Sequence, residues 1–204
     1  MATLTSDKTE KICQAALRLF TARGYAETNV PSIAKAAGVG VGTLYRYFKN
    51  KEGIFNTLFQ QVLRHFLDEL EIRVQPSDSV QDQYSQLFDA SATLLINYSA
   101  ELHFVSLNAF NEVLDSTSRE AREKVITYFT DFLKNGQRQE VFTKADPDTL
   151  LVLLYGSVEM MASQLWIKHE LYSDPAAETR LVHQMKNLLW NALTVERKVF
   201  VEEV

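Results

Sequence analysis

The side chains with the clearest chemical potential lie between residues 41 and 51, in the segment VGTLYRYFKNK. On a helix, three apolar residues of this segment share one side, namely Val41, Leu44 and Phe48. The opposite side and its flank carry small, hydroxylated, aromatic and basic groups: Gly42, Thr43, Tyr45, Arg46 and Tyr47. Arginine can grip two acceptors on guanine, threonine can contact a thymine methyl or a phosphate, and glycine permits close approach to a DNA backbone. The segment therefore predicts a helix that enters the major groove.

A second short helix is predicted just before this one, over residues 30–37. Its apolar residues follow the i, i+3, i+4, i+7 spacing of a one-sided helix: Val30, Ile33, Ala34 and Ala37. Gly38 then supplies the backbone freedom that a helix C-terminus favours. Two short helices joined in this way form a helix-turn-helix. A longer helix from about residue 6 to residue 23, ended by Gly24, is expected to support the pair.

The side chains of this unit are predicted to make two kinds of contact with DNA, to bases and to phosphates. Thr43 and Arg46, together with Val41 and Tyr45, are expected to contact bases. Three residues are expected to anchor phosphates: Thr28, Tyr47 and Lys51. Lys51 follows a capping Asn50 at a helix start, where exposed N–H groups favour an anion.

Residues 33–51, IAKAAGVGVGTLYRYFKNK, and the EGIF that follows them resemble the recognition signature of the TetR/AcrR family of bacterial transcriptional regulators. The resemblance is ungapped and covers roughly the first 55 residues. It implies an all-α homodimer whose last two long helices pair with their copies, and whose heads bind a palindromic operator in double-stranded DNA. It also implies a small-molecule pocket in the body. Residue 40 is glycine where the family usually has serine or a similar polar residue, so a side-chain cap is lost there.

The charge of the chain is divided between its two parts. The 204 residues together have a formal net charge of −5. Residues 1–55 nevertheless hold 8 Lys and Arg against 4 Asp and Glu, whereas residues 56–204 hold 13 against 22. A basic N-terminal part on an acidic body is expected if only the N-terminal part meets phosphates. We therefore predict a DNA-binding domain over residues 1–50 and a helical effector-binding and dimerisation domain over residues 51–204.

The rest of the chain predicts an all-α fold of about nine helices. Its 7 glycines and 4 prolines are too few for a turn-rich β protein. A helix from Glu52 to about Val74 is expected to join the two domains as a strut. Further helices are predicted over residues 80–98, 101–114 and 118–139, and after the Asp-Pro pairs at 146–147 and 174–175. Gly136, inside one of these helices, invites close packing.

Several polar or aromatic side chains interrupt the apolar helices of the body and are candidates to contact an effector: His103, Asn108, Asn111, Tyr128, Glu159 and Trp166. Ordinary structural roles compete with this one, because a histidine among apolar neighbours is more often a satisfied residue and asparagines can face solvent. Glu159 is the most informative, because an unpaired carboxylate is costly to bury. It can meet solvent, pair across a dimer, or orient a cationic or hydroxylated ligand.

The sequence contains no catalytic or metal-binding motif that we recognise. The four histidines are scattered, and no HExxH, paired-cysteine spacing or glycine-rich phosphate loop occurs. We therefore expect no enzyme activity, no metal and no cofactor. A single cysteine, Cys13, allows no disulfide framework, which fits a cytoplasmic protein. The longest run without a charged residue is 11 residues, short of the ~20 apolar residues of a membrane span, so no membrane partner is expected.

The favoured function is a homodimeric repressor released from a palindromic operator by a small hydrophobic or amphipathic effector. The alternative is a helical regulator or adaptor controlled by a protein partner, without a small-molecule ligand. A salt-sensitive shift of a palindromic duplex distinguishes a DNA-binding regulator from an adaptor. Release of that duplex by a panel of compounds distinguishes the two modes of control.

Overall fold

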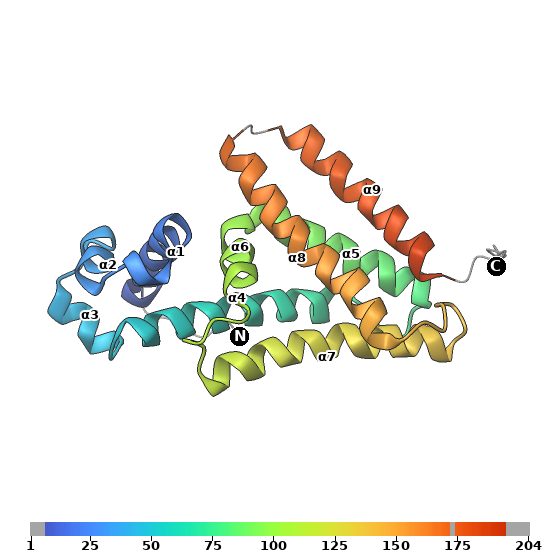
Figure 1. The fold of residues 1–204 in the computed structure, drawn as a ribbon, viewed down its shortest axis with the longest axis horizontal. Coiled ribbons are helices and arrows are strands. Elements are labelled where there is room, and N and C mark those ends of the chain that lie inside the picture. Colours follow the sequence, from blue (N-terminus) through green and yellow to red (C-terminus); the bar gives the residue numbers. More distant parts are fainter. Residues whose placement is uncertain (1–6, 172–173, 195–204) are drawn as a thin grey trace, which may run out of the picture.

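A computed structural model describes residues 7–171 and 174–194 of the chain. Nine helices follow one another in these ranges: α1 (Asp7–Glu27), α2 (Val30–Ala36), α3 (Val41–Tyr47), α4 (Lys51–Arg73), α5 (Val80–Asn97), α6 (Ser99–Asn108), α7 (Ser116–Arg138), α8 (Pro147–Leu171) and α9 (Pro175–Leu193). Figure 1 shows α1–α3 as a small head at one end of the molecule, and α4 running from this head into a body made by the later helices. The predicted all-α fold with a helical head, strut and body is confirmed.

The head is a three-helix unit with its own apolar core. Gly24 has φ 77° and ψ 170°, so the regular part of α1 stops there, as predicted. The Asn29 side chain accepts a hydrogen bond from the Ser32 N–H and caps α2, and Gly38, with φ 67°, turns the chain toward α3. Apolar residues of all three helices and of the turn after α3 are buried in this core: Ile12, Ala16, Phe20, Ile33, Leu44 and Phe48. The predicted helix-turn-helix is therefore present.

Helix α4 connects the head to the body. The Asn50 side chain accepts a hydrogen bond from the Gly53 N–H and caps its first turn, as the sequence predicted. Along its 23 residues α4 contacts α1 of the head and α5, α6 and α7 of the body. Because one continuous helix serves both parts, the division between residues 50 and 51 remains a prediction.

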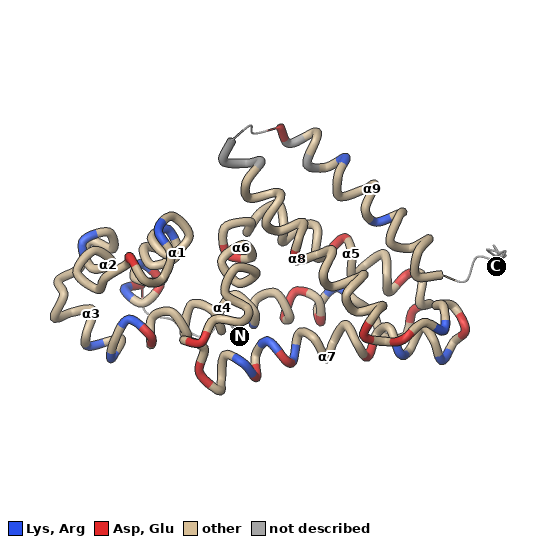
Figure 2. The backbone as a smooth tube through the Cα atoms, in the orientation of Figure 1, with Lys and Arg blue, Asp and Glu red and all other residues tan. Residues whose placement is uncertain are grey.

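The body packs its helices around α4 and α8. Helix α7 runs beside α4, and α8 packs against both α6 and α7 (Figure 1). Helix α9 contacts α5 and α8 and lies at the edge of the body away from the head (Figure 1). Few charged residues occur along α8, whereas several Lys and Arg residues lie in the head and at the start of α4 (Figure 2). This arrangement buries one side of α8, including Leu154, Val158 and Ala162, and leaves Val152 and Met160 on its outer side exposed.

The sequence prediction for α6 was wrong at its C-terminus. The predicted helix over residues 101–114 ends at Asn108 in the structure. The Asn108 side chain donates to the Phe104 carbonyl at 2.7 Å, and the Asn111 side chain donates to Asn108 and accepts from the Val113 N–H, both at 3.0 Å. Asparagine side chains compete in this way with backbone hydrogen bonds and favour turns. The two asparagines therefore end the helix and shape the loop that follows it.

The close packing predicted at Gly136 is found at the C-terminal end of α7. A Cβ atom added to Gly136 would lie 2.1 Å from a ring carbon of Phe142. The Phe142 ring is buried and packs edge-on against Phe132 and Trp190, with ring centroids 5.4 and 5.9 Å away. The neighbouring Thr143 N–H donates to the Leu193 carbonyl at 2.8 Å. The loop after α7 thus holds the end of α9 in place.

Candidate DNA interface and effector cavity

Helix α3 turns nearly all of its side chains toward solvent. Only Leu44 of this helix is buried, and it packs into the core of the head. The residues predicted to contact DNA on this helix are exposed, except for Thr43, which is half-buried: Val41, Gly42, Thr43, Tyr45, Arg46 and Tyr47. Val41 is 39% exposed, although its spacing placed it on the apolar side with Leu44 and Phe48. Gly40 caps the helix without a side-chain hydrogen bond, so the amino end of α3 is open to an approaching backbone.

Thr28 occupies a different environment from the one that the sequence predicted. Its side chain is only 2% exposed, and its hydroxyl donates to the Gly24 carbonyl at 2.8 Å and to the Leu19 carbonyl at 3.3 Å. The chain leaves the helical path at Gly24, and the Thr28 hydroxyl donates to the Gly24 carbonyl at this break. A buried hydroxyl cannot reach a phosphate, so the predicted phosphate contact of Thr28 does not fit the structure.

The Lys51 ammonium is directed into the head. It donates to the carbonyl oxygens of Tyr25 and Thr28, each at 2.8 Å, and lies 3.5 Å from the carbonyl oxygen of Ala26. It also lies 4.0 Å from the centre of the Tyr25 ring. An ammonium has three N–H donors, and here they all face this turn. Lys51 therefore braces the junction between α1, α2 and α4, and a phosphate contact would require it to give up one of these carbonyls.

The body contains a narrow cavity beside α8. It is lined by residues of α4, α5, α6, α7 and α8: Leu63, Phe66, Leu95, Leu102, Val105, Ser106, Val125, Tyr155, Val158, Glu159 and Ala162. Its volume is about 30 Å³, which is room for roughly two water molecules. Eight of these eleven residues are apolar, and the three polar ones are Ser106, Tyr155 and Glu159. The lining therefore suits an apolar group, and the cavity has to widen before it can take one.

Glu159 is the charged residue of the cavity wall, and Tyr155 lines the same cavity. Burial raises the pKa of the Glu159 carboxyl, while the Tyr155 hydrogen bond and the attraction of Arg122 oppose this rise. Burial also raises the pKa of Tyr155, and the Glu159 charge adds to this shift. Glu159 lines the cavity and is partly exposed, so its role in orienting a ligand stays a prediction. The sequence did not single out Tyr155, although it lies one helical turn before Glu159 and so on the same side of α8.

Arg122 was not identified from the sequence either. Its Nε atom is buried without a hydrogen-bond partner, and its guanidinium lies 4.3 Å from the centre of the Phe110 ring. A buried donor without a partner is costly, so such a group marks a place where a further acceptor would be favourable. Because Arg122 interacts electrostatically with both Tyr155 and Glu159, these three residues form one polar cluster beside an apolar cavity.

His103 and Trp166 pack against each other beyond the wall of the cavity. Their rings are stacked with centroids 5.8 Å apart, and the His103 Nδ1 atom lies 3.3 Å from the Ser163 hydroxyl. Burial lowers the pKa of His103, which favours the neutral imidazole. Neither residue lines this cavity, so their contact with an effector stays a prediction. His103 is a satisfied residue between α6 and α8.

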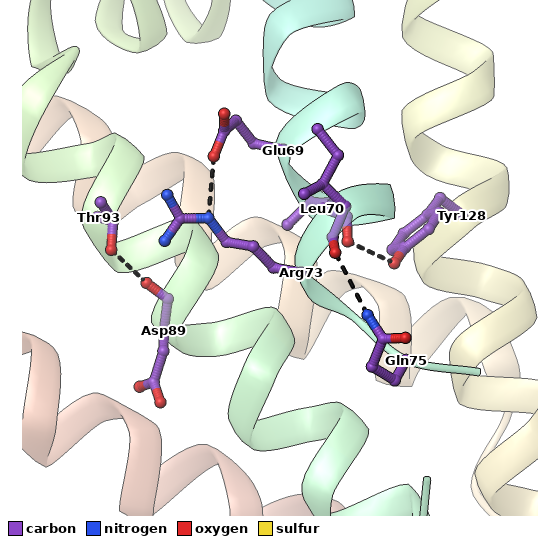
Figure 3. Close-up of polar contacts among 8 residues, drawn as sticks. Glu69, Leu70, Arg73, Gln75, Asp89, Thr93 and Tyr128 are labelled. Carbon is purple, nitrogen blue, oxygen red and sulfur yellow. Dashed lines mark hydrogen bonds and ion pairs between the residues drawn. The ribbon is translucent and has the colours of Figure 1, made fainter. Parts of the chain in front are cut away.

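The three remaining body candidates also lie away from the cavity. Tyr128 donates from its hydroxyl to the Leu70 carbonyl at 3.5 Å, near the C-terminal end of α4 (Figure 3). Figure 3 also shows the Arg73–Glu69 ion pair, at 2.9 Å, on the same stretch of α4. Asn108 and Asn111 shape the loop after α6, as described above. Tyr128, Asn108 and Asn111 do not line this cavity, so their effector contacts stay a prediction.

A buried amide connects the strut to the body near the head. The Asn56 side chain donates to the carbonyl of Val113 at 2.9 Å and to that of Glu52 at 3.0 Å. Its oxygen accepts from the Asp115 N–H at 2.9 Å and from the Ser118 hydroxyl at 2.7 Å. All the donors and acceptors of this amide are thus used, and they tie α4 to the loop between α6 and α7.

Aromatic rings form a second connection between the head and the body. The Phe55 ring of α4 packs edge-on against Phe20 of α1 at 5.4 Å and against Phe104 of α6 at 5.1 Å. Phe20 and Phe104 are themselves stacked 6.1 Å apart. All three rings are buried, and such packing transmits small displacements because protein interiors are dense. Since α6 also lines the cavity, one helix contacts both the head and the cavity.

A head with an exposed recognition helix, carried on a helical body with an internal cavity, defines a helix-turn-helix transcriptional regulator. Residues 12–58 match the family described as "Bacterial regulatory proteins, tetR family", and residues 59–195 match the domain described as "Tetracyclin repressor-like, C-terminal domain". The chain belongs to the TetR family of bacterial transcriptional regulators. Members of this family bind DNA and act as dimers.

Known relatives extend over most of the chain. The HTH-type transcriptional regulator YhgD of Bacillus subtilis (strain 168) is 27% identical over 158 residues, which cover 74% of this chain and 81% of that protein. The fatty acid metabolism regulator protein of the same strain is 33% identical over 85 residues, covering 42% and 44% of the two chains. The solved structure of the fatty acid degradation regulator FadR from Bacillus halodurans has a TM-score of 0.75 at 25% identity, over 93% of this chain and 97% of that one.

Two further observations concern the described part of the chain only. One helix, Pro147–Ile167 within α8, is long and apolar enough to cross a membrane by length and composition. The core helix of a soluble protein meets the same criterion, and α8 packs against four other body helices. Among residues 7–171 and 174–194, no group of three or more His, Cys, Asp or Glu side chains could hold a metal ion.

Proposed function

We propose that the protein is a homodimeric repressor that a small, mainly apolar effector releases from a palindromic operator in the cytoplasm. The observation that carries this proposal is the exposed side of α3, on a head whose core is independent of that side. Arg46, Thr43 and Val41 would contact base edges, with Tyr45 beside them, and Tyr47 would contact a phosphate. Gly42 has no atom within 4 Å of an added Cβ, so a DNA backbone can approach it closely.

The dimer would form through the outer side of α8 and α9. Val152, Met160 and Ile167 are exposed on α8, and Leu188 is exposed on α9. The three α8 residues are separated by eight and seven positions, which places them on one side of the helix. Exposed apolar residues on two adjacent helices mark a surface that another protein surface covers. A second copy of these helices would complete a four-helix bundle and set the two α3 helices about one DNA turn, roughly 34 Å, or a simple multiple apart.

The effector would bind between the body helices and widen the cavity. Its apolar part is inferred from the lining of the cavity, in which eight of the eleven residues are apolar. The relatives that regulate fatty acid metabolism make aliphatic compounds the first class to test. An effector releases the operator only if it binds the released conformation more tightly than the DNA-bound one.

Two linked measurements test this function. Selection of duplexes from a random pool should enrich an inverted repeat, and binding to it should weaken steeply with salt. A panel of aliphatic acids, alcohols and amines with chains of increasing length should then contain compounds that release the selected duplex. If the protein bound an inverted repeat but was released by none of the panel, aliphatic control would be excluded while operator binding stood.

A further inference from the structure

A larger space lies directly outside the cavity, where the head meets the body. It is a groove of about 660 Å³ between α1, α4, α5 and α6. Its floor is apolar and is formed by Leu58, Val62, Phe66, Leu94 and Leu102. Its rim carries polar side chains from α1, α4 and the α5–α6 junction: Glu10, Gln14, Arg64, His65, Tyr98 and Glu101. The groove thus offers an apolar surface below and hydrogen-bonding groups above.

The groove and the cavity share part of their walls. Phe66 of α4 and Leu102 of α6 line both spaces. The cavity and the groove therefore adjoin at two side chains on neighbouring helices. Rotation of side chains is much faster than separation of packed helices, so this wall is the easiest place for the cavity to open.

We propose that the groove is the entrance to the cavity and holds the polar end of a single-chain amphiphile whose aliphatic end passes between Phe66 and Leu102. This inference rests on the proposed control by an aliphatic effector, and it assigns that effector a route and an orientation. The polar end stays in the groove because its hydrogen-bonding needs are met at the rim, whereas most of the cavity wall is apolar.

The sizes of the two spaces support this assignment. Small-molecule sites usually have volumes of ~300–1,000 Å³, which the groove reaches at about 660 Å³ and the cavity, at about 30 Å³, does not. A ligand that used both spaces would need only the shared wall to open. Because Glu10 and Glu101 share the rim with Arg64 and His65, the polar end is recognised by hydrogen bonding rather than by one sign of charge.

The position of the groove gives such a ligand direct contact with the head. Glu10 and Gln14 belong to α1, whereas the other walls belong to the strut and to the body. Any movement of α1 relative to α6 changes the width of the groove. A ligand seated there would therefore favour one position of the head, and its binding would be coupled to operator binding.

The orientation can be measured with stearic acids that carry a nitroxide at carbon 5 or at carbon 16. The full-length protein is labelled with a bimane fluorophore at Gln14→Cys, on the rim of the groove. Native Cys13 also lines the groove, so it is replaced by alanine in both labelled proteins and only the introduced cysteine reacts. The control carries the same label at Leu107→Cys, an exposed residue of α6 that lines neither space.

The nitroxide at carbon 5, near the polar end, should quench the label at position 14 at least twice as strongly as the nitroxide at carbon 16. Both should quench the label at position 107 weakly and equally. Stronger quenching at position 14 by the carbon-16 nitroxide, or equal quenching by both, would overturn the orientation while leaving aliphatic control intact. If neither stearate bound, the inference would fail together with the aliphatic effector on which it rests.

The gate is tested separately by a matched pair of variants. Leu102→Trp narrows the opening, and Leu107→Trp adds the same bulk on the exposed side of the same helix. Stopped-flow mixing with the carbon-5 stearate should show association at least tenfold slower for Leu102→Trp and unchanged for Leu107→Trp. Leu102→Ala should speed both association and dissociation. Equal rates in all three variants and the unmodified protein would show that the chain enters by another route.

Discussion

The head and the body arrange their functional side chains in opposite ways. In the head, α3 buries Leu44 alone and exposes its other side chains around a small separate core. In the body, Tyr155 and Glu159 face an internal cavity between five helices. An outward surface suits a large and rigid partner such as DNA, whereas an inward one can take only a small molecule that displaces packed side chains. Because the DNA-binding surface and the cavity lie in different parts of the molecule, binding in one can affect the other only through the contacts that α4 and α6 make with both parts.

The largest loss of operator affinity is expected when the two heads of a dimer are no longer held together. The double variant Met160→Glu, Leu188→Glu places carboxylates on the apolar outer side of α8 and α9, and should be monomeric. Loss of the second head should weaken operator binding by about 10²–10⁴-fold, the usual gain from linking two binding sites. Light scattering gives the mass, and fluorescence anisotropy gives the affinity.

The matched control for this variant is Ile72→Glu on α4. Ile72 is 69% exposed, compared with 61% for Met160 and 63% for Leu188, so this control adds one carboxylate, where the double variant adds two, at an equally open apolar position. This control should remain dimeric and bind the operator normally. A dimeric double variant would contradict the proposed interface.

The next largest effect is a loss of stability when the hydrogen bonds that join α4 to the body are removed. Asn56→Ala removes an amide with four hydrogen bonds and leaves the Val113 carbonyl and the Asp115 N–H without partners. The free energy of unfolding should fall by about 3 kcal/mol, since each buried group left unpaired costs about 1–3 kcal/mol. Urea unfolding measures this change. Asn97→Ala, at an exposed asparagine of α5, is the control and should change stability by less than about 0.5 kcal/mol.

Arg46→Ala tests the outward surface of the head. It should weaken operator binding by about 1–3 kcal/mol and relax specificity at one base pair. Arg46→Lys keeps the charge but loses the two-pronged geometry, so it should lose most of the specificity and less of the affinity. Both variants are compared on the selected operator and on random DNA. An equal loss on the two duplexes would exclude base recognition by Arg46.

Lys51→Ala separates bracing from phosphate binding. Loss of its bonds to the Tyr25 and Thr28 carbonyls should lower the free energy of unfolding by about 1–2 kcal/mol, because hydrogen bonds to charged groups are worth about 1.5–3 kcal/mol and this one is partly exposed. The exposed Lys49→Ala should have no such effect on stability. The dependence of operator binding on salt then shows whether Lys51 also binds a phosphate. A slope reduced by about one would show that Lys51 also contacts a phosphate.

The smallest effect is expected at the inward site and depends on pH. Because the pKa of Glu159 is raised in the folded state, the folded protein binds more protons than the unfolded chain just above the unfolded pKa, and stability falls as pH rises through this range. Glu159→Gln removes this penalty. The variant should therefore gain stability relative to the unmodified protein from about pH 4.5 upward, by a few tenths of a kcal/mol because the carboxyl is partly exposed. Thermal unfolding between pH 4 and 8 measures the difference in stability between the variant and the unmodified protein. A difference that did not change with pH would contradict the raised pKa of Glu159.

The sequence predicted the outward site far better than the inward one. The spacing of Ile33, Leu44 and Phe48 is enough to define which sides of two short helices are buried, so the exposed side of α3 follows directly. Thr28 was misjudged because it is buried against the C-terminal part of α1, where its hydroxyl donates to the Gly24 carbonyl, and spacing alone does not reveal this contact.

The cavity depends on contacts between helices that are distant in the sequence. In the sequence, His103 and Trp166 differ from their apolar neighbours and were therefore candidates to contact an effector. In the structure their rings stack on each other. Tyr155 could have been found from its position one turn before Glu159, but Arg122 could not, because nothing local places α7 beside that part of α8. Local periodicity therefore identifies exposed surfaces, while cavities require the tertiary arrangement.

Sedimentation velocity on the selected inverted repeat, with and without an aliphatic acid that fits the groove, would test ligand-controlled operator binding in a single titration. One dimer should bind each duplex, and the acid should release it as an intact dimer. A monomer on the duplex, or a complex that every aliphatic acid in the series leaves unchanged while it occupies the protein, would contradict this mechanism.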